Sequence, residues 1–138
     1  PDSGAWMAEP LAYDGDDLED RVKIKDLTIG GASTNLVNCP GIPGVGQFYA
    51  NPTFTLDLSD LDDDYWRVQF KTEGSCDATL LFQDADGNFH FDDDSGSGLN
   101  SRIRLFDMEP LNGRVNIWIG TYSGQTCDDM ELIMRAWD

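Results

Sequence analysis

The chain has 138 residues with 26 acidic and 9 basic side chains, which gives a formal net charge of −17. This length fits one domain that buries its own apolar core. Nucleic acid and anionic membranes are bound through Lys and Arg, so the acidic excess argues against both partner classes and favours cations and basic proteins. The sequence also lacks a run of about 18 apolar residues that would span a membrane.

The sequence divides into an acidic N-terminal arm, residues 1–20, and a domain of residues 21–138. The apolar side chains of the arm follow neither a helical nor a strand period. A terminal segment of this kind frays unless other parts of the structure hold it. We expect the arm to pack either on its own domain or on a neighbouring copy of the chain.

Segments with apolar residues at every second position follow one another through the domain. In the first segment the apolar residues change face after Ile24, so we expect a β-bulge at Asp26. Turn-forming residues separate the segments, and none of them has a helical period. These features predict an all-β fold, an antiparallel β-sandwich of the jelly-roll type with an N-terminal extension. The predicted strands lie at 22–29, 54–58, 66–70, 79–82, 103–105, 115–119 and 132–136.

Residues 38–52 are dense in Pro and Gly and predict a long surface loop, a kind of segment that is usually functional or pinned. The chain has three cysteines, so an oxidising compartment would leave one disulfide and one free thiol. We expect the pair Cys39–Cys76, because Cys39 lies in this loop and Cys76 just precedes a strand. The alternatives are the pair Cys39–Cys127 and three buried, reduced cysteines.

The stretch from Gln83 to Leu99 holds a dense group of carboxylates and no Lys or Arg. Carboxylates this close repel one another, and Ca²⁺ would offset the repulsion because it accepts carboxylate and amide oxygens in flexible geometry. Two further acidic clusters occur at 16–20 and 57–64. The predicted calcium ligands are Asp84, Asp86, Asn88, Asp92 and Asp94.

The first part of this stretch, residues 84–88, places oxygen-bearing side chains at alternate positions, as an EF-hand loop does. The EF-hand pattern then fails, because Phe89 stands where that motif needs Gly and Ser95 stands where it needs Glu. The alternative is a hairpin turn in which the Asp-Gly pair supplies a positive φ and Asp side chains cap backbone amides. For the second part, residues 92–96, the alternative is a strand edge whose carboxylates are simply hydrated. We expect Phe89 and Phe91 to face the core, with His90 turned outward.

Aromatic side chains are the second group of candidate ligand contacts, since extracellular β-sandwiches that bind glycans stack sugars on exposed Trp or Tyr. The predicted contacts are Trp118, Tyr122 and Tyr49. Trp118 lies between two isoleucines of a predicted strand, so it should point away from their face, either outward or under a loop. Core packing is expected for at least one of Trp66 and Trp118.

The sequence predicts no enzyme activity. His90 is the one histidine, which rules out the usual zinc sites, and no nucleophile stands in a recognisable catalytic motif. A pair of carboxylates that hydrolyses a glycosidic bond is the catalytic alternative.

Three motifs occur in order along the chain: Asp-x-Asp-Gly at 84–87, Asp-Asp-Asp-Ser-Gly at 92–96, and Leu-Asn-Gly at 111–113, which leads into Ile-Trp-Ile-Gly-Thr-Tyr at 117–122. Together they resemble the bacterial pre-peptidase C-terminal domain family. The resemblance covers residues 32–137 and implies a secreted β-sandwich that often accompanies proteases, some members of which bind Ca²⁺ or polymers such as collagen.

The chain departs from this family at two places. Phe91 stands where many members have a Cys, which bears on the disulfide pattern. Arg114 follows Gly113, where a Tyr is common. Neither departure affects the acidic residues.

The residues and the resemblance together predict a secreted or cell-surface, non-catalytic, calcium-stabilised module with a structural or adhesive role. A chain that begins with Pro1 rather than Met is typical of a processed product. We expect self-association through the arm, in an extracellular assembly or filament. The alternatives are an accessory polymer- or carbohydrate-binding domain of a secreted protease and a glycoside hydrolase.

Overall fold

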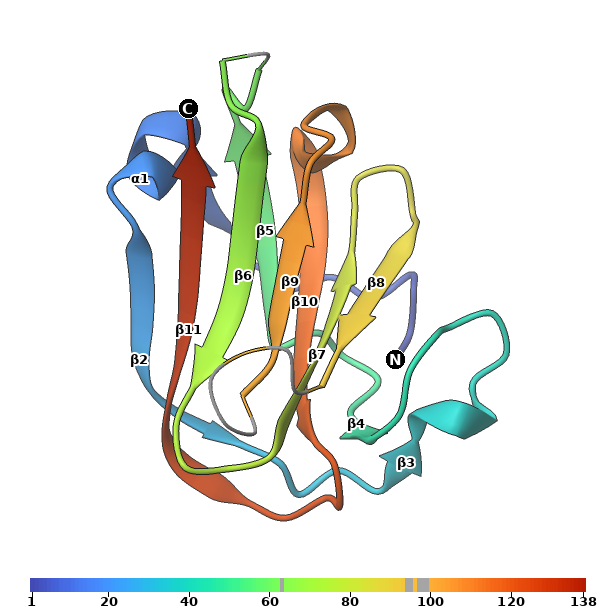
Figure 1. Ribbon diagram of the computed structural model, residues 1–138. Coiled ribbons are helices and arrows are strands. Elements are labelled where there is room, and N and C mark those ends of the chain that lie inside the picture. Colours follow the sequence, from blue (N-terminus) through green and yellow to red (C-terminus); the bar gives the residue numbers. More distant parts are fainter. Residues whose placement is uncertain (63, 94–95, 97–99) are drawn as a thin grey trace.

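The computed structural model describes residues 1–62, 64–93, 96 and 100–138. Two β-sheets pack face to face around the main apolar core (Figure 1), which confirms the predicted all-β sandwich. In these described residues, no helix has the length and apolar character needed to cross a membrane.

The larger sheet, sheet A, is built around the long strand β10. This strand pairs antiparallel with β5 on one side and with β7 on the other, and β8 pairs with β7 at one edge. At the opposite edge β1 pairs with β5 in parallel. The strands of sheet A are β1 (Leu11–Asp14), β3 (Thr34–Asn35), β4 (Gln47–Phe48), β5 (Phe54–Ser59), β7 (Ala78–Gln83), β8 (Phe89–Asp92) and β10 (Gly113–Thr121).

The smaller sheet, sheet B, is antiparallel and has the strand order β2-β11-β6-β9. The pairing of β2 with β11 shifts register between Ile24 and Leu27, and Asp26 adopts a φ of 59°. The structure thus confirms the predicted irregularity at Asp26. The strands of sheet B are β2 (Val22–Ile29), β6 (Arg67–Glu73), β9 (Arg102–Leu105) and β11 (Cys127–Trp137).

The N-terminal arm packs on its own domain in this single chain. Its strand β1 extends sheet A, and the short helix α1 (Gly15–Glu19) buries Leu18 completely. Asp14 begins the helix with a capping box, in which its carboxylate accepts a hydrogen bond from the Asp17 amide at 2.9 Å. Neither element was predicted, because each is too short to show a period. The two 3-10 turns are η1 (Leu36–Asn38) and η2 (Glu109–Leu111).

Alternate side chains of the two sheets fill the space between them. Val115, Ile117 and Ile119 of β10 point into this core, and the ring centroids of Phe70 in sheet B and Phe82 in sheet A are 4.7 Å apart. Each fully buried side chain of this size contributes about 1.5–3 kcal/mol relative to the exposed state. The core therefore joins the two sheets into one unit.

A second apolar cluster covers the outer face of sheet A. It contains Trp118, Leu81 and Phe48 of sheet A together with Leu36 of η1, and Cys39 and Ile42 of the predicted long surface loop pack against it. The loop is thus pinned by apolar packing.

Phe89 and Phe91 also pack against this second cluster. The expectation that they face the main core is therefore wrong: they lie on the side of β8 that faces away from sheet B.

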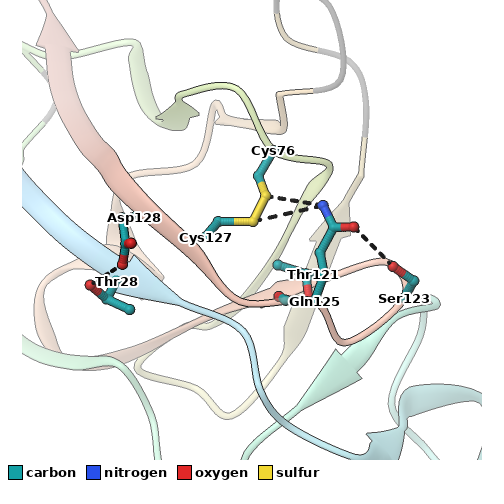
Figure 2. Close-up of a disulfide and its surroundings, with 7 residues drawn as sticks. All are labelled: Thr28, Cys76, Thr121, Ser123, Gln125, Cys127 and Asp128. Carbon is teal, nitrogen blue, oxygen red and sulfur yellow. Dashed lines mark hydrogen bonds between the residues drawn. A yellow bond between two sulfur atoms is a disulfide. The ribbon is translucent and has the colours of Figure 1, made fainter.

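The disulfide joins Cys76 to Cys127 (Figure 2). Cys39 is a half-buried free thiol. The predicted pair Cys39–Cys76 is therefore wrong, and so is the alternative pair Cys39–Cys127. Cys76 lies just before β7 in sheet A and Cys127 begins β11 in sheet B, so the bond ties the two sheets together at one end. The Gln125 side-chain nitrogen lies 3.1 Å from the Cys76 sulfur.

Replacing both bridged cysteines with Ala should lower the free energy of unfolding by about 4 kcal/mol, because the bond closes a loop across a sequence separation of 51 residues. Urea unfolding followed by circular dichroism measures this loss. Cys39→Ala is the control, and we expect a smaller effect from it. A double variant that unfolds at the urea concentration of the unmodified chain would contradict the assigned pairing.

Candidate functional site

The candidate site begins at the turn between β7 and β8, which Asp84 organises. The backbone carbonyl of Asp84 accepts a hydrogen bond from the Gly87 amide at 3.0 Å. Its side-chain Oδ1 accepts two more, from the amides of Asp86 at 3.0 Å and Asn88 at 2.9 Å. Gly87 has a φ of 89°, a region that Gly enters at little cost. The structure therefore confirms the hairpin turn with an Asp cap that the sequence allows here.

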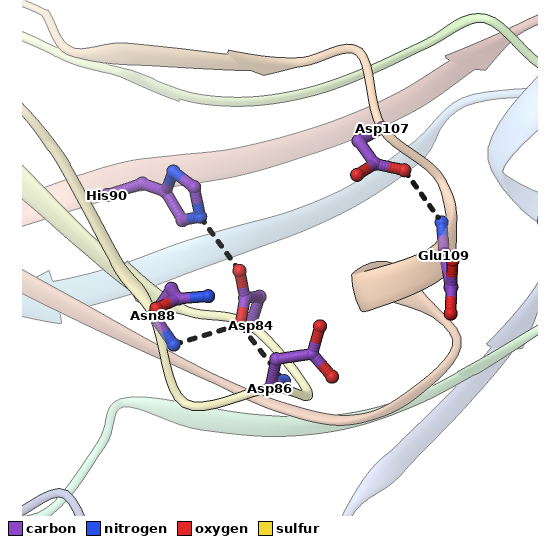
Figure 3. A network of polar contacts seen from close by, with 6 residues as sticks. All are labelled: Asp84, Asp86, Asn88, His90, Asp107 and Glu109. Atoms are coloured by element: carbon purple, nitrogen blue, oxygen red, sulfur yellow. Dashed lines mark hydrogen bonds and ion pairs between the residues drawn. The ribbon is translucent and has the colours of Figure 1, made fainter.

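His90 contacts the other oxygen of the same carboxylate. His90 Nε2 lies 3.0 Å from Asp84 Oδ2, and the Asp84 side chain is 3% exposed (Figure 3). The His90 ring is 6.0 Å from the Phe82 ring, on the side of sheet A that faces sheet B. The expectation that His90 faces away from the core is therefore wrong. The sequence held a signal for this contact, because Phe82, Asp84 and His90 share one face of the hairpin.

A cleft of about 530 Å³ lies beside this pair, between the β7–β8 turn and the segment that follows β9. Asp86 and Asn88 line one wall, and Phe106 and Asp107 line the other. Phe106 is 63% exposed, and Asp107 Oδ1 accepts a hydrogen bond from the Glu109 amide at 3.3 Å (Figure 3). Oxygen acceptors beside one apolar ring form a concave surface suited to a small polar ligand.

The structure brings together only some of the predicted calcium ligands. Asp84, Asp86 and Asn88 share the turn, whereas Asp92 lies at the far end of β8, where its Oδ2 accepts a hydrogen bond from the Arg102 amide at 2.8 Å. The fifth predicted ligand, Asp94, lies outside the described residues.

Asp84 is a poor calcium ligand in this geometry. Both of its side-chain oxygens already contact protein groups, two amides at Oδ1 and His90 at Oδ2. Within the part of the chain that the structure describes, no three His, Cys, Asp or Glu side chains are grouped to hold a metal ion. Calcium binding at this turn stays a prediction.

The predicted aromatic contacts have different environments. Trp118 is 1% exposed, and its Nε1 donates a hydrogen bond to the Ala50 carbonyl at 3.2 Å. Its prediction as a ligand contact is therefore wrong, because the second cluster covers its ring. Trp118 lies under a loop, which is one of the two positions expected for it. Of Trp66 and Trp118, Trp118 is the one packed in a core, and Trp66 is 51% exposed. Tyr49 and Tyr122 are exposed, and their roles stay predictions.

A separate group of carboxylates lines a depression at the end of the sandwich where β11 ends. We call it the acidic depression. It has a volume of about 630 Å³. The acidic clusters at 16–20 and 57–64, which are distant in sequence, meet here because α1 packs beside the β5–β6 connection. The described residues that line it include no Lys or Arg. They are Asp14, Asp16, Glu19, Asp60, Asp62, Asp64, Tyr65 and Asp138.

The carboxylates of the acidic depression disturb the ionisation of their neighbours. The pKa of Glu19 is raised, chiefly by a side-chain hydrogen bond with Asp138 and by the negative charge of that residue. Loss of hydration and the charges of Glu19 and Asp16 raise the pKa of Tyr65 to about 12. The Tyr65 hydroxyl lies 3.3 Å from Glu19 Oε2. The depression therefore concentrates negative charge that a cation would relieve.

Positive charge gathers on the outer face of sheet B, the sheet in the foreground of Figure 1. Alternate residues of its strands point away from the core. The register places eight of the nine Lys and Arg residues on this surface or at its border, and the ninth, Arg114, lies on β10. We call this surface the basic face. It comprises Arg21, Lys23, Lys25, Arg67, Lys71, Arg102, Arg104 and Arg135.

Aromatic rings lie among the cations of the basic face. The guanidinium carbon of Arg67 is 3.7 Å from the centroid of the Trp137 ring, and that of Arg135 is 4.7 Å from it. Trp66 stacks with Phe106 at 6.4 Å beside them. Each cation–π contact between a guanidinium group and a ring contributes about 0.5–1 kcal/mol at exposed sites. These contacts hold the two guanidinium groups against the surface of the sheet.

The cations of the basic face are close enough to repel one another. The pKa of Arg104 is lowered, first by loss of hydration and then by the positive charges of Arg102 and Arg67. Lys71 forms an ion pair with Glu73 at 3.3 Å, at the end of the face farthest from the acidic depression. Glu73 and Glu131 lie opposite each other on the same outer face, and the eight cations outnumber these two carboxylates.

Trp118→Ala should lower the free energy of unfolding by about 3–5 kcal/mol, because it removes a buried ring and leaves a cavity under the loop. Tyr122→Ala is the matched control and should change it by less than about 0.5 kcal/mol, since Tyr122 is exposed. Urea unfolding measures both. Equal effects of the two substitutions would contradict the assignment of Trp118 to the core.

If calcium binds at the turn, adding it to chelator-treated protein at ten times its Kd should stabilise the fold by about 1.4 kcal/mol. The melting temperature followed by circular dichroism reports this gain. Asp86→Asn should abolish the rise, and Asp62→Asn in the acidic depression should leave it intact. If only Asp62→Asn loses the calcium-dependent rise in melting temperature, the ion binds in the acidic depression instead. If calcium does not raise the melting temperature of the unmodified chain, no stabilising calcium ion binds.

The chain has no match among protein-family models, and comparison with curated proteins also finds no match. The resemblance to the pre-peptidase C-terminal domain family therefore stays a prediction from the three motifs.

Proposed function

We propose that this chain is a non-catalytic adhesive module that acts outside the cell and binds a negatively charged partner through the basic face. The observation that carries the proposal is the segregation of charge, with eight of nine cationic side chains on or bordering one sheet face of a chain whose net charge is −17. Concentrated charge of one sign steers and orients a partner of the opposite sign.

The environment of Asp84 and His90 supports a binding module rather than an enzyme. The Asp84 carboxylate organises the β7–β8 turn through two amides and contacts His90 with its second oxygen. These contacts give the pair a structural task. A hydrolase that used Asp84 would have to release it from the turn during the reaction.

The disulfide supports a location outside the cytosol, since such bonds persist in oxidising compartments. Calcium, as a stabilising ion, and self-association remain parts of the proposal as the sequence predicts them. Residues 1–20 pack on their own domain in the single chain, so a neighbouring copy would contact the exposed side of this arm.

A module that binds a polysaccharide in the cleft beside Asp84 is the second candidate. Phe106, which is exposed, lines this cleft together with Asp86 and Asn88, so the cleft offers an apolar ring and oxygen acceptors together. Asn88→Ala and Phe106→Ala should weaken glycan binding if this candidate is correct. Because Arg104 also lines this cleft, Lys23→Gln on the far strand β2 is the control that should leave glycan binding unchanged.

Arg104→Gln should weaken binding to immobilised poly-glutamate about two- to fivefold, the effect of one exposed charge contact worth about 0.4–1 kcal/mol. Arg114→Gln removes the same charge from sheet A and should leave the affinity unchanged. Surface plasmon resonance at low ionic strength measures both variants.

Equal losses in the two variants would contradict the proposal, because they would show that net charge alone sets the affinity. Turnover of a glycan or peptide substrate that is lost in Asp84→Asn would contradict its non-catalytic part.

A further inference from the structure

We propose that the basic face binds the acidic depression of a second copy of this chain, so that copies associate head to tail. This inference rests on the proposed function and names the partner. The chain carries both halves of the contact, eight cations on or beside one sheet face and seven carboxylates around the depression. A second copy therefore supplies a negatively charged surface of suitable density.

The two surfaces lie on different sides of one rigid sandwich. The basic face is the outer surface of sheet B, whereas the depression lies at the end where α1 and the C-terminal end of β11 meet (Figure 1). They adjoin at α1, where Glu19 lines the depression and also borders Arg21. The disulfide and the shared core keep this arrangement fixed, so most cations of the face can reach a depression only on another molecule.

The ionisation of the groups involved agrees with this pairing. Loss of hydration and then the neighbouring cations lower the pKa of Arg104, and the neighbouring carboxyl of Asp138 raises the pKa of Glu19, so like charges lie close together on each surface. Bringing the two surfaces together would reduce both repulsions at once.

The exposed rings of Trp66 and Phe106 lie beside the basic face and would add apolar area to such a contact. They stack on each other beside Arg67, on the side of sheet B near the acidic depression.

The contact joins two different surfaces, which makes it heterologous. Each bound copy then offers a free basic face or a free depression to the next, so association continues until a ring closes or a filament forms. A symmetric face-to-face dimer is disfavoured because it would place two positive surfaces against each other.

Charge exchange tests the proposal. The first variant, Lys23→Glu with Lys25→Glu, reverses charge on the basic face. The second variant, Asp62→Asn with Asp64→Lys, alters the depression. Its amide side chain at position 62 keeps an oxygen acceptor for the backbone amide of residue 64, to which Asp62 Oδ1 is bonded at 3.0 Å. Sedimentation velocity follows association against protein concentration, and circular dichroism checks that each variant is folded.

The unmodified chain should associate, and each variant alone should associate at least tenfold more weakly. An equimolar mixture of the two variants, or one chain with all four substitutions, should regain association because opposite charges face each other again. Arg114→Gln should have no effect.

Two results would overturn the proposal. One is a chain that stays monomeric at about 100 µM. The other is association that neither charge variant weakens. In either case, poly-glutamate binding tests the adhesive function separately. If that binding still depends on Arg104, the adhesive function stands with a foreign anionic polymer as its partner. If it does not depend on Arg104, both proposals fail.

Discussion

The burial of β10 on both of its faces is the constraint on which the rest of the structure depends. Val115, Ile117 and Ile119 fill the space between the sheets, and Trp118 points to the opposite side. A central strand with large apolar side chains on both faces needs cover on both. Sheet B provides one cover, and the segment from Leu36 to Phe48 provides the other.

This cover decides where charged side chains can lie. The second apolar cluster occupies much of the outer face of sheet A, and the core occupies the space between the sheets. The outer face of sheet B then receives most of the cations, and the end of the sandwich near α1 receives many of the carboxylates. Charge segregation is thus a consequence of how the apolar layers are stacked, and it gives the molecule two surfaces of opposite sign.

Alternation of apolar residues was enough to predict the sandwich, because each long strand has one face on the main core. It also placed Trp118 opposite Ile117 and Ile119 and located the irregularity at Asp26. The arm was harder, since four residues of strand and five of helix show no period. Phe89 and Phe91 were assigned to the wrong core because alternation cannot tell which of two apolar layers a strand faces.

The features that bear on function depend on contacts between distant segments. Cys76 pairs with Cys127 because β7 and β11 begin beside each other, and the spacing of cysteines in the sequence does not reveal this arrangement. The sequence shows the acidic clusters at 16–20 and 57–64 separately, and only the packing of α1 brings them together. The basic residues are scattered along the chain, and only strand register reveals a common face.

Zero-length cross-linking of lysines to carboxylates, in a mixture of chains with light and heavy nitrogen, is the measurement that tests the central claim most directly. All the lysines, Lys23, Lys25 and Lys71, belong to the basic face, so every lysine cross-link between isotopic forms reports what that face contacts. The account predicts mixed-isotope cross-links from these lysines to acidic residues within 14–19 and 60–64. Cross-links confined to one isotopic form, or mixed ones spread evenly over the acidic residues of the chain, would contradict it.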